Sequence, residues 1–505
     1  MTSQPNDGLP SRVRQAAGRH PDRQAAVLGE RRLTYRELAA AVRTCAASLD
    51  RSGVRRGDRV AHLGAPDVDF LITFLAAGEI GAVWLGLNPR YTDREVAYVL
   101  SDASPRLVID AVASDEDRRG LRGALRGGSP VEVVQVAELS ASPDESFEPR
   151  LEHHEAAALV YTSGSTGRPK GALVRHASLV HAGEAYASQY PVARAPYLRS
   201  LCNLPINHVG CLCDVVATTI CAAGTIVFMR DFEPDKIGPL IASEELTHVG
   251  QVPTMWRYIL EAVSFDTGEL PSLEWAIWSG APMPRGLADR LVRPGLRLSN
   301  CYGMTETTGS VCFTDPDGGL DHLTGTIGRP IDSDNLRLRM DGTDVVGTQI
   351  TGEVQVRGPW VMAGYYGDAE RTAAAMDGEW FRTGDLAERT EDGSLRLVGR
   401  LKEMFKSGGY NVYPREIEEV IEAHPSVSAA AVIAAPDEVY GEVGFAFVIR
   451  EGAVSADELD AWCRERVANY KVPKRFAVED SLPLLPIGKI DKEALRRRLS
   501  SEAAA

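Results

Sequence analysis

The stretch "YTSGSTGRPKGALV", residues 161–174, poses the question that decides the fold. Its first eleven residues hold four Ser or Thr, three Gly, one Arg and one Lys. Residues 156–160 before it are apolar enough for a buried strand, and residues 176–190 after it have the pattern of a helix. Glycines let a backbone approach a ligand, and exposed N–H groups beside hydroxyls form an anion-binding concavity. A flexible linker would lack the flanking elements, so the stretch favours a phosphate-binding loop over a linker or a structural turn.

Helix and strand patterns alternate on both sides of this loop. Thr34 is placed to cap a helix that carries Leu38 and Val42 on its apolar face. The run at 70–87 contains Glu79, so we interpret it as a core helix followed by a strand, not as a membrane span. Further short apolar runs predict strands at 59–63, 107–110, 225–228 and 247–252. This alternation predicts an α/β body with largely parallel sheets.

The pattern of predicted elements changes toward the C-terminus. From about Gly352 the sequence has short strands and turns, and the last 90 or so residues have the pattern of a small α/β unit. Pro414 opens a predicted helix, residues 427–434 and 444–449 read as strands, and Ser455 with Glu458 forms a capping-box pair. We therefore predict a large N-terminal α/β body with layered sheets, residues 1–400, and a small mobile α/β domain, residues 401–505.

Composition narrows the class of partner. A formal charge of −15 over 505 residues argues against a nucleic-acid surface. The eight cysteines form no CxxC pair, which predicts reduced, mostly buried thiols. Residues 1–23 contain no apolar segment of a signal peptide, so we expect a cytoplasmic protein. We expect neither nucleic-acid binding nor a membrane span, and either a monomer or a homodimer.

Five motifs then occur in a fixed order along the chain. They are "YTSGSTGRPKG" at 161–171, "NCYGMTETTG" at 300–309, "WFRTGDL" at 380–386, "GRLKEMFKSGGYNVYPREIE" at 399–418 and "LPIGKIDKEAL" at 485–495. Together they resemble the adenylate-forming superfamily, in its branch of acyl- and aryl-CoA synthetases. The resemblance implies that a carboxylate attacks the α-phosphate of ATP, giving an acyl-adenylate and pyrophosphate. A thiol, usually that of CoA, then takes the acyl group and releases AMP.

The resemblance also implies the nucleotide-binding residues. Glu306 is expected to ligate Mg²⁺ together with Thr162, since Mg²⁺ takes one or two carboxylates plus phosphate oxygens. Thr305 would reach the α-phosphate, and Tyr302 would stack on adenine. Asp385 would hold the ribose hydroxyls. The full set of ATP and AMP contacts implied is Thr162, Ser163, Gly164, Ser165, Thr166, Gly167, Lys170, Ser279, Gly280, Ala281, Tyr302, Gly303, Met304, Thr305, Asp385 and Arg400.

The last motifs imply a moving domain. Lys489 resembles the lysine that bridges the substrate carboxylate and the α-phosphate in the first step, which makes it catalytic with Glu306 and Thr305. Lys402 stands at the hinge position. After adenylation the small domain would swing, and the segment Ser407, Gly408, Gly409 and Tyr410 would line the thiol tunnel.

The acyl pocket is the least determined part of the resemblance. His208 resembles a gate residue of CoA ligases, and the expected wall is His208, Val209, Leu212, Trp256, Gly303, Gly309, Ser310 and Val311. Amino-acid-activating relatives carry an Asp just after the gate, where this chain has Val209, so an acid with no charge besides its carboxylate is favoured. Asp214 lies near enough to take that role if the alignment shifts. Aromatic, alicyclic and medium-chain acids all stay open.

Three other functions compete with an acid–CoA ligase. A free-standing enzyme that loads a carrier protein's phosphopantetheine would use the same motifs. A luciferase-like oxidation shares both fold and adenylation. An inactive nucleotide-binding module would show decayed motifs, whereas Lys170, Glu306, Asp385, Arg400 and Lys489 are all present.

Overall fold

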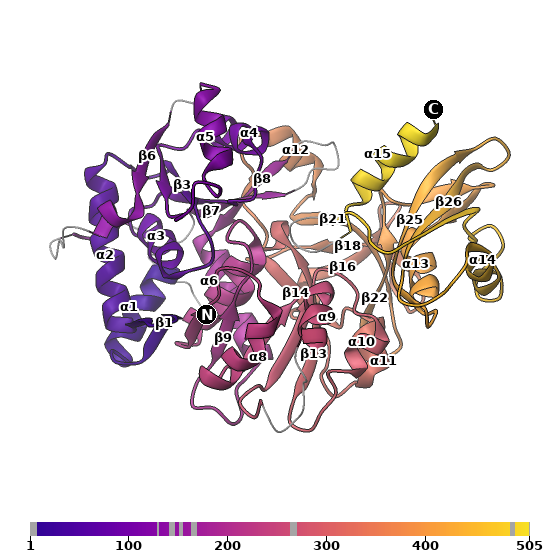
Figure 1. Cartoon of the computed structure of the whole chain (residues 1–505), viewed down its shortest axis with the longest axis horizontal. Helices are drawn as coiled ribbons and strands as arrows, with labels where there is room; N and C mark the ends of the chain where they lie inside the picture. The colour runs from indigo at the N-terminus through magenta and orange to yellow at the C-terminus, as the bar shows by residue number, and fades with distance from the viewer. Residues whose placement is uncertain are drawn as a thin grey trace.

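The protein is described here from a computed structural model that covers the whole chain. The structure describes residues 8–128, 131–140, 147–150, 155–162, 169–262, 270–484 and 490–503. Figure 1 shows a large N-terminal body, coloured from indigo to orange, with a smaller C-terminal unit in yellow beside it. Within the described residues, no helix is both long and apolar enough to cross a bilayer.

Two mostly parallel sheets form the body. The larger runs β15-β14-β13-β12-β11-β9-β10-β1-β2, with antiparallel strands only at its two edges. The second runs β19-β8-β7-β4-β3-β5-β6 and is antiparallel only where β8 pairs with β7 and β19. The strands of the first sheet are β1 (Gln24–Leu28), β2 (Arg31–Thr34), β9 (Arg199–Cys202), β10 (Thr225–Phe228), β11 (His248–Gln251), β12 (Trp275–Ser279), β13 (Arg297–Met304), β14 (Gly309–Phe313) and β15 (Arg329–Pro330). Those of the second are β3 (Arg59–Leu63), β4 (Val83–Leu87), β5 (Leu107–Asp110), β6 (Glu132–Gln135), β7 (Ala156–Thr162), β8 (Lys170–Arg175) and β19 (Gly364–Tyr365).

Helices fill the space between these sheets and cover their outer faces. One core packs α1, α2, α3, α6 and the π-helix η2 between the two sheets, around side chains such as Trp84 and Phe228. A second core lies under α8, α9 and α10, and a third under α4 and α5. The helices of the body are α1 (Leu9–Arg19), α2 (Tyr35–Arg51), α3 (Val68–Glu79), α4 (Asp93–Ala103), α5 (Arg119–Arg126), η1 (Val136–Ser140), α6 (His176–Gln189), η2 (Gly210–Ala217), α7 (Thr218–Cys221), α8 (Pro234–Ser243), α9 (Pro253–Ala262), α10 (Arg285–Asp289), η3 (Thr305–Thr307), α11 (Gly319–Gly325), η4 (Ser333–Asn335) and α12 (Ala369–Ala374).

A third, antiparallel sheet connects the body to the C-terminal unit. It runs β17-β16-β18-β21-β20, with β22 paired to β21. Its strands are β16 (Leu336–Met340), β17 (Thr343–Asp344), β18 (Thr351–Val356), β20 (Met376–Asp377), β21 (Trp380–Arg389) and β22 (Leu395–Arg400). The sequence pattern placed the change to short strands near Gly352, but the sheet already begins at Leu336.

The C-terminal unit has its own sheet and core. The sheet runs β24-β23-β26-β25, and β27 pairs with β26. Its elements are β23 (Phe405–Ser407), β24 (Tyr410–Val412), α13 (Pro414–Glu422), β25 (Val427–Asp437), β26 (Gly441–Arg450), α14 (Ala456–Arg464), β27 (Arg475–Glu479) and α15 (Lys492–Ala503). Phe405, Ile417, Val432 and Leu459 belong to a hydrophobic cluster made only of this unit's residues.

Local signals in the sequence explain why these elements start where they do. Thr34 accepts the N–H of Glu37 at 3.2 Å and completes a capping box, so the predicted start of α2 is confirmed. Ser455 likewise caps α14 by accepting the N–H of Glu458. The predicted capping box is formed only in this half, and the Glu458 carboxylate lies 3.6 Å from His424 Nε2. The α/β fold and the free-thiol state of the eight cysteines are also confirmed.

Candidate active site

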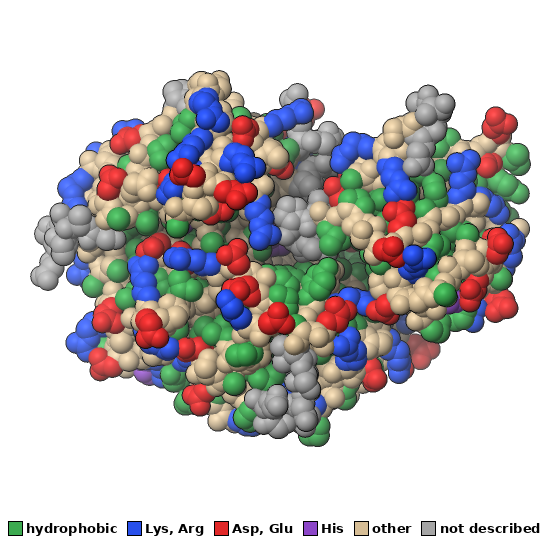
Figure 2. All heavy atoms as spheres, viewed as in Figure 1, with side chains coloured by type: hydrophobic (Ala, Val, Ile, Leu, Met, Phe, Trp, Pro, Cys, Tyr) green, Lys and Arg blue, Asp and Glu red, His purple; other side chains and the backbone are tan. Residues whose placement is uncertain are grey.

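The predicted site residues meet in a cleft between the body and the C-terminal unit. The cleft has a volume of about 2480 Å³, and Figure 2 shows the surface hollowed at this place. Residues at the carboxyl ends of the parallel strands line it, among them Asn88 after β4, Thr162 at the end of β7, Gln251 at the end of β11 and Ser279 at the end of β12. Ligands bind outside the carboxyl ends of strands in open α/β sheets, so the topology itself places a site here.

A lysine, a tyrosine and a glutamate form the first polar cluster of the cleft. Lys170 Nζ donates to the hydroxyl of Tyr365 at 2.9 Å, and that hydroxyl donates to Glu306 Oε1 at 2.8 Å. Lys170 Nζ also lies 3.7 Å from Glu306 Oε1. Burial lowers the pKa of Lys170, although Glu306 opposes that shift. A cation and a carboxylate are thus held together beside the end of the Gly-rich stretch.

A tyrosine, an aspartate and an arginine form the second cluster. The Tyr302 hydroxyl donates to Asp385 Oδ2 at 2.7 Å, and Arg400 Nε donates to Asp385 Oδ1 at 3.0 Å. Burial, and then the Asp385 carboxylate, raise the pKa of Tyr302 well above its usual value. The Asp385 carboxylate also raises the pKa of Arg400. Asp385 is buried, whereas the Arg400 side chain is 61% exposed.

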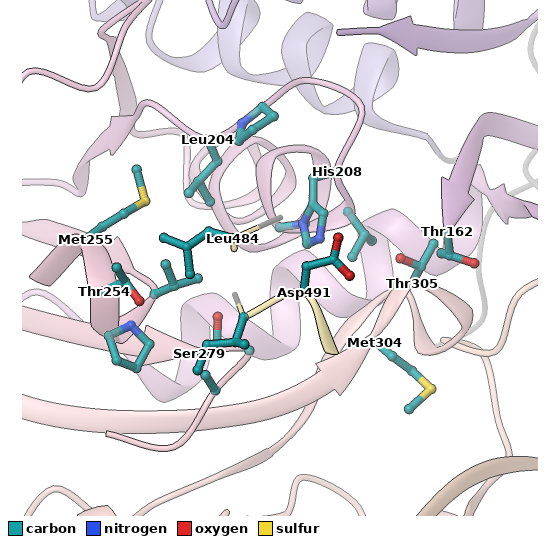
Figure 3. A pocket seen from close by; sticks show the side chains of 18 of the residues that line it. Thr162, Leu204, His208, Thr254, Met255, Ser279, Met304, Thr305, Leu484 and Asp491 are labelled. Atoms are coloured by element: carbon teal, nitrogen blue, oxygen red, sulfur yellow. The ribbon is translucent and has the colours of Figure 1, made fainter. Parts of the chain in front are cut away.

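The strand pair β13–β14 and the segment at 279–281 form one wall of the cleft. Ser279, Gly280, Ala281, Gly303, Met304, Thr305, Gly309 and Ser310 all line it. A Cβ on Gly303 would lie 1.9 Å from the carbonyl oxygen of Gly309, so this crossing requires glycine. Figure 3 shows Thr162, Ser279, Met304 and Thr305 on this side of the pocket.

Only part of the predicted acyl-pocket wall faces the cleft. His208 and Val209 line it, together with Gly303, Gly309 and Ser310. Leu212, Trp256 and Val311 do not: each is buried in a hydrophobic cluster. Trp256 is fixed there by a hydrogen bond of 2.9 Å from its Nε1 to the carbonyl of Ile277. These three residues are a correction to the prediction, because a one-dimensional pattern does not say which face of a helix or strand meets the cleft.

Many described residues of the C-terminal unit line the cleft, and some of them come before and after Lys489 in sequence. Leu484 and Asp491 line it, and Figure 3 shows both in the same pocket as His208 and Ser279. Lys489 lies between them in sequence and falls outside the described residues, as do Ser163, Gly164, Ser165, Thr166 and Gly167.

The two other predicted C-terminal features occupy different places. Lys402 lines the cleft. Its positive charge lowers the pKa of Lys170, but this effect is smaller than those of burial, which lowers that pKa, and of Glu306, which raises it. Ser407, Gly408, Gly409 and Tyr410 do not line it. Tyr410 is 61% exposed and stacks on Tyr470 with ring centroids 4.6 Å apart. The residues expected at a thiol tunnel therefore lie away from the site in this orientation of the C-terminal unit.

The sequence reasoning missed Tyr365, which connects Lys170 with Glu306. It lies 195 residues from Lys170 in the chain and reaches it because β19 pairs with β8, Tyr365 opposite Ala172. A two-residue strand has no periodicity to detect, so the sequence carried no signal for this contact.

Comparison with known proteins agrees with this geometry. The family model described as AMP-binding enzyme matches residues 13–366, and the model described as AMP-binding enzyme C-terminal domain matches residues 416–489. A feruloyl-CoA synthase from Amycolatopsis sp. is 37% identical over 98% of this chain and 99% of its own. A long-chain-fatty-acid–CoA ligase from Mycobacterium tuberculosis is 33% identical over 93% of this chain and 94% of its own.

Solved structures show the same architecture. The o-succinylbenzoate CoA synthetase of Bacillus subtilis, in complex with its acyl-adenylate intermediate, superposes with a TM-score of 0.86 at 28% identity, over 98% of this chain and 99% of its own. An ATP-bound MatB from Rhodopseudomonas palustris gives 0.88 at 29%, with the same two coverages. The chain therefore belongs to the AMP-binding enzyme family, within the adenylate-forming superfamily, and is an acid–thiol ligase of the AMP-forming acyl-CoA synthetase type.

Proposed function

We propose that this protein is an ATP-dependent carboxylic acid–CoA ligase whose acid carries no charge besides its carboxylate. The observation that carries the proposal is the presence of two clusters on one cleft, Lys170–Tyr365–Glu306 and Tyr302–Asp385–Arg400. Phosphoryl transfer needs positioning and charge neutralisation more than covalent help. The first cluster supplies a cation for phosphate oxygens and a carboxylate that could ligate a metal ion. The second supplies a carboxylate and a tyrosine that could bind a nucleoside.

The donor set fits Mg²⁺ as a cofactor of ATP. Within the described part of the chain, no group of three or more His, Cys, Asp and Glu side chains is arranged so that it could hold a metal ion. Mg²⁺ bound with a nucleotide needs only one or two protein oxygens, because phosphates and water provide the rest. We propose Glu306 and Thr162 as those ligands, and bound Mg²⁺ would neutralise phosphate charge there. A Bacillus subtilis relative has been solved in complex with ATP and a magnesium ion.

We assign the remaining residues by their place on the cleft. Lys170 would contact phosphate oxygens, and Thr305 the α-phosphate. Asp385 would accept the ribose hydroxyls, because each of its oxygens retains a second lone pair besides those used by Tyr302 and Arg400. Ser279, Gly280, Ala281, Gly303 and Met304 would surround the base and the reacting carboxylate. The acyl chain would extend between His208, Val209 and Gly309.

Nucleotide affinity provides a test of the role of Asp385. Asp385→Ala is expected to weaken both ATP and AMP binding by at least tenfold, because ribose is common to the two nucleotides and a carboxylate hydrogen bond contributes ~1.5–3 kcal/mol. Titration calorimetry with each nucleotide measures it. Glu388→Ala, on the same strand but outside the cleft, is the matched control and should bind normally. An unchanged AMP affinity in Asp385→Ala would remove the ribose assignment.

Metal dependence provides a separate test of Glu306. Glu306→Gln keeps the side-chain volume and an acceptor for Tyr365 but removes the negative charge. The concentration of Mg²⁺ that gives half-maximal pyrophosphate release should rise by about tenfold or more, since Mg²⁺ prefers charged oxygen ligands. Glu388→Gln again serves as the control. If both variants follow the wild-type Mg²⁺ curve, the metal lies elsewhere.

We place the division between the two mobile parts at Arg400–Lys402. Leu401 N donates to the carbonyl of Gly384 at 2.8 Å, and Glu403 N closes a turn on the carbonyl of Arg400 at 3.0 Å. Beyond this turn, the C-terminal unit contacts the body through Arg257, which pairs with Glu451 and donates to the carbonyl of Ser428 at 3.2 Å. A swing that brings residues 407–410 to the cleft must break these contacts.

A pyrophosphate-release screen over aliphatic, aromatic and amino acids tests the proposed substrate class. Uncharged acids should be active and amino acids inactive. The second candidate is an enzyme that loads a carrier protein, since the cleft geometry of the first step is the same for both. With the best acid, CoA and a phosphopantetheine-bearing carrier protein are offered separately: we expect thioester with CoA, and exclusive transfer to the carrier would establish the alternative.

A further inference from the structure

One carboxyl group on the wall of the cleft has no partner that explains it. Asp214 lies in the π-helix η2 and lines the cleft. Its Oδ1 is buried and accepts no hydrogen bond from any described residue. Irregular π-helical turns occur frequently at functional sites, so this residue is a candidate for more than packing.

The three buried aspartates among the described residues of the body, by contrast, all have a cationic partner. Asp67 pairs with Arg230 at 3.1 Å, Asp110 with Arg118 at 2.6 Å, and Asp385 with Arg400 at 3.0 Å. Among the described residues, no lysine or arginine pairs with Asp214. The Asp214 side chain is half-buried and receives a hydrogen bond from the backbone N–H of Ser310, so no salt bridge among the described residues uses the charge of its carboxyl group.

The surroundings of Asp214 are neutral. Burial raises the pKa of its carboxyl to about 7, and only the backbone N–H of Ser310 opposes that shift. The titratable groups that interact with it include Cys213 on its own helix, Tyr186 on α6, Tyr190 just after α6 and Cys301 on β13, and burial raises the pKa of each. None of these carries a positive charge.

Gly309 makes the space that the carboxyl occupies, and Gly210 lies beside both the carboxyl and the His208 ring. A Cβ on Gly309 would lie 2.6 Å from Asp214 Oδ1, and Gly309 has a φ of +91°. A Cβ on Gly210 would lie 3.7 Å from Oδ2. Gly210, Gly309 and Asp214 all line the cleft, so the carboxyl group sits at the wall that the acyl part of the substrate would reach.

We propose that Asp214 hydrogen-bonds a hydroxyl group on the acyl part of the acid, which makes the enzyme selective for hydroxylated acids over their unsubstituted counterparts. This inference rests on the proposed function, since it takes this wall as the acyl pocket. A hydroxyl both donates and accepts, so it pairs with a carboxylate or with a protonated carboxyl. An ammonium group has three donors to satisfy, and the carboxyl's neighbours are thiols, phenols, glycines and the imidazole of His208.

The test compares matched acids in the pyrophosphate-release assay. Benzoate, cinnamate and octanoate are each measured beside their monohydroxy and monoamino derivatives, with the hydroxyl or amine at each position in turn. For the wild type we expect kcat/KM for one hydroxylated acid to exceed that of its parent by at least about tenfold, because a site built to bind a hydroxyl rejects the analogue that lacks it. Equal rates throughout, or preference for an amino derivative, would overturn the proposal.

Variants then attribute the preference to the residue. Asp214→Leu should bring the ratio of kcat/KM for the hydroxylated acid to kcat/KM for its parent acid to about one. Asp214→Asn, which keeps volume and hydrogen bonding, should retain part of the ratio and covers the case that the leucine variant does not fold. Asp110→Asn is the control, because Asp110 is buried but lies outside the cleft. If the Asp214 variants lower kcat/KM equally for the hydroxylated and the parent acid, Asp214 has only a structural role, and the assignment is overturned.

Failure of the proposed function would look different. If no acid in the panel releases pyrophosphate, the ligase proposal fails and the assignment of Asp214 falls with it. If acids react but without hydroxyl preference, only the inference about Asp214 is wrong.

Discussion

Lys489→Ala is expected to lower the rate of acyl-adenylate formation by about a hundred- to thousandfold, because loss of one preorganised charge at a developing anion typically costs ~3–4 kcal/mol. The flanking residues Leu484 and Asp491 both line the cleft beside His208 and Ser279. The described residues before and after Lys489 in sequence therefore meet the cleft, which supports the role that we propose for this lysine. The second step, from a supplied acyl-adenylate to the thioester, should be affected much less.

The two half-reactions are measured separately, by pyrophosphate release and by thioester formation from preformed adenylate. Lys474→Ala removes a lysine from the same C-terminal unit, away from the cleft, and should leave both rates unchanged. If Lys489→Ala slows both steps to the same extent, the lysine does not act specifically in the first one.

Lys402→Pro is expected to have the opposite effect, with a steep fall in thioester formation and a smaller loss of adenylation. Proline fixes φ near roughly −65° and also restricts Leu401 before it. The structure has residues 407–410 away from the cleft, which is the orientation that adenylation would use. If the backbone at the hinge can no longer rotate, the C-terminal unit stays in that orientation.

Lys402→Ala is the matched control, because it removes the same charge but leaves the backbone free to rotate. The decisive quantity is the ratio of the two half-reaction rates in the proline and alanine variants. Equal ratios would place the pivot outside Arg400–Lys402, and the proposed domain boundary would move with it.

A charged network connects this turn to the helix that follows Lys489. Lys492 Nζ, at the start of α15, lies 2.7 Å from Glu403 Oε2 and 2.9 Å from Glu418 Oε1. Together these carboxylates raise the pKa of Lys492 against the effect of burial. Glu403, directly after the proposed hinge, is therefore held to the start of α15, so this turn and α15 should move together.

The sequence predicted the fold where local signals were strong. Two kinds of local signal are confirmed. The structure has the predicted helix caps at Thr34 and Ser455 and the predicted strands β3, β5 and β10. Each of these elements is determined by residues that are close together in the sequence. The extent of the third sheet was not predicted, because short antiparallel strands such as β17 and β20 depend on partners elsewhere in the chain.

The candidate site was also predicted only in part. Motif resemblance led to Glu306, Asp385 and Arg400, whose contacts form two compact clusters. It also placed Leu212 and Trp256 on the pocket wall, although both are core residues. Which face a side chain presents, and which distant strand brings a partner such as Tyr365, depend on tertiary packing that no single stretch encodes.

The most direct test of the central claim is the product balance of the complete reaction. With an active acid, ATP, Mg²⁺ and CoA, the account predicts that AMP, pyrophosphate and acyl-CoA form in equal amounts, and that pyrophosphate release without CoA stops after about one equivalent of enzyme if the adenylate stays bound. Formation of ADP and phosphate, or consumption of ATP without any thioester, would contradict it.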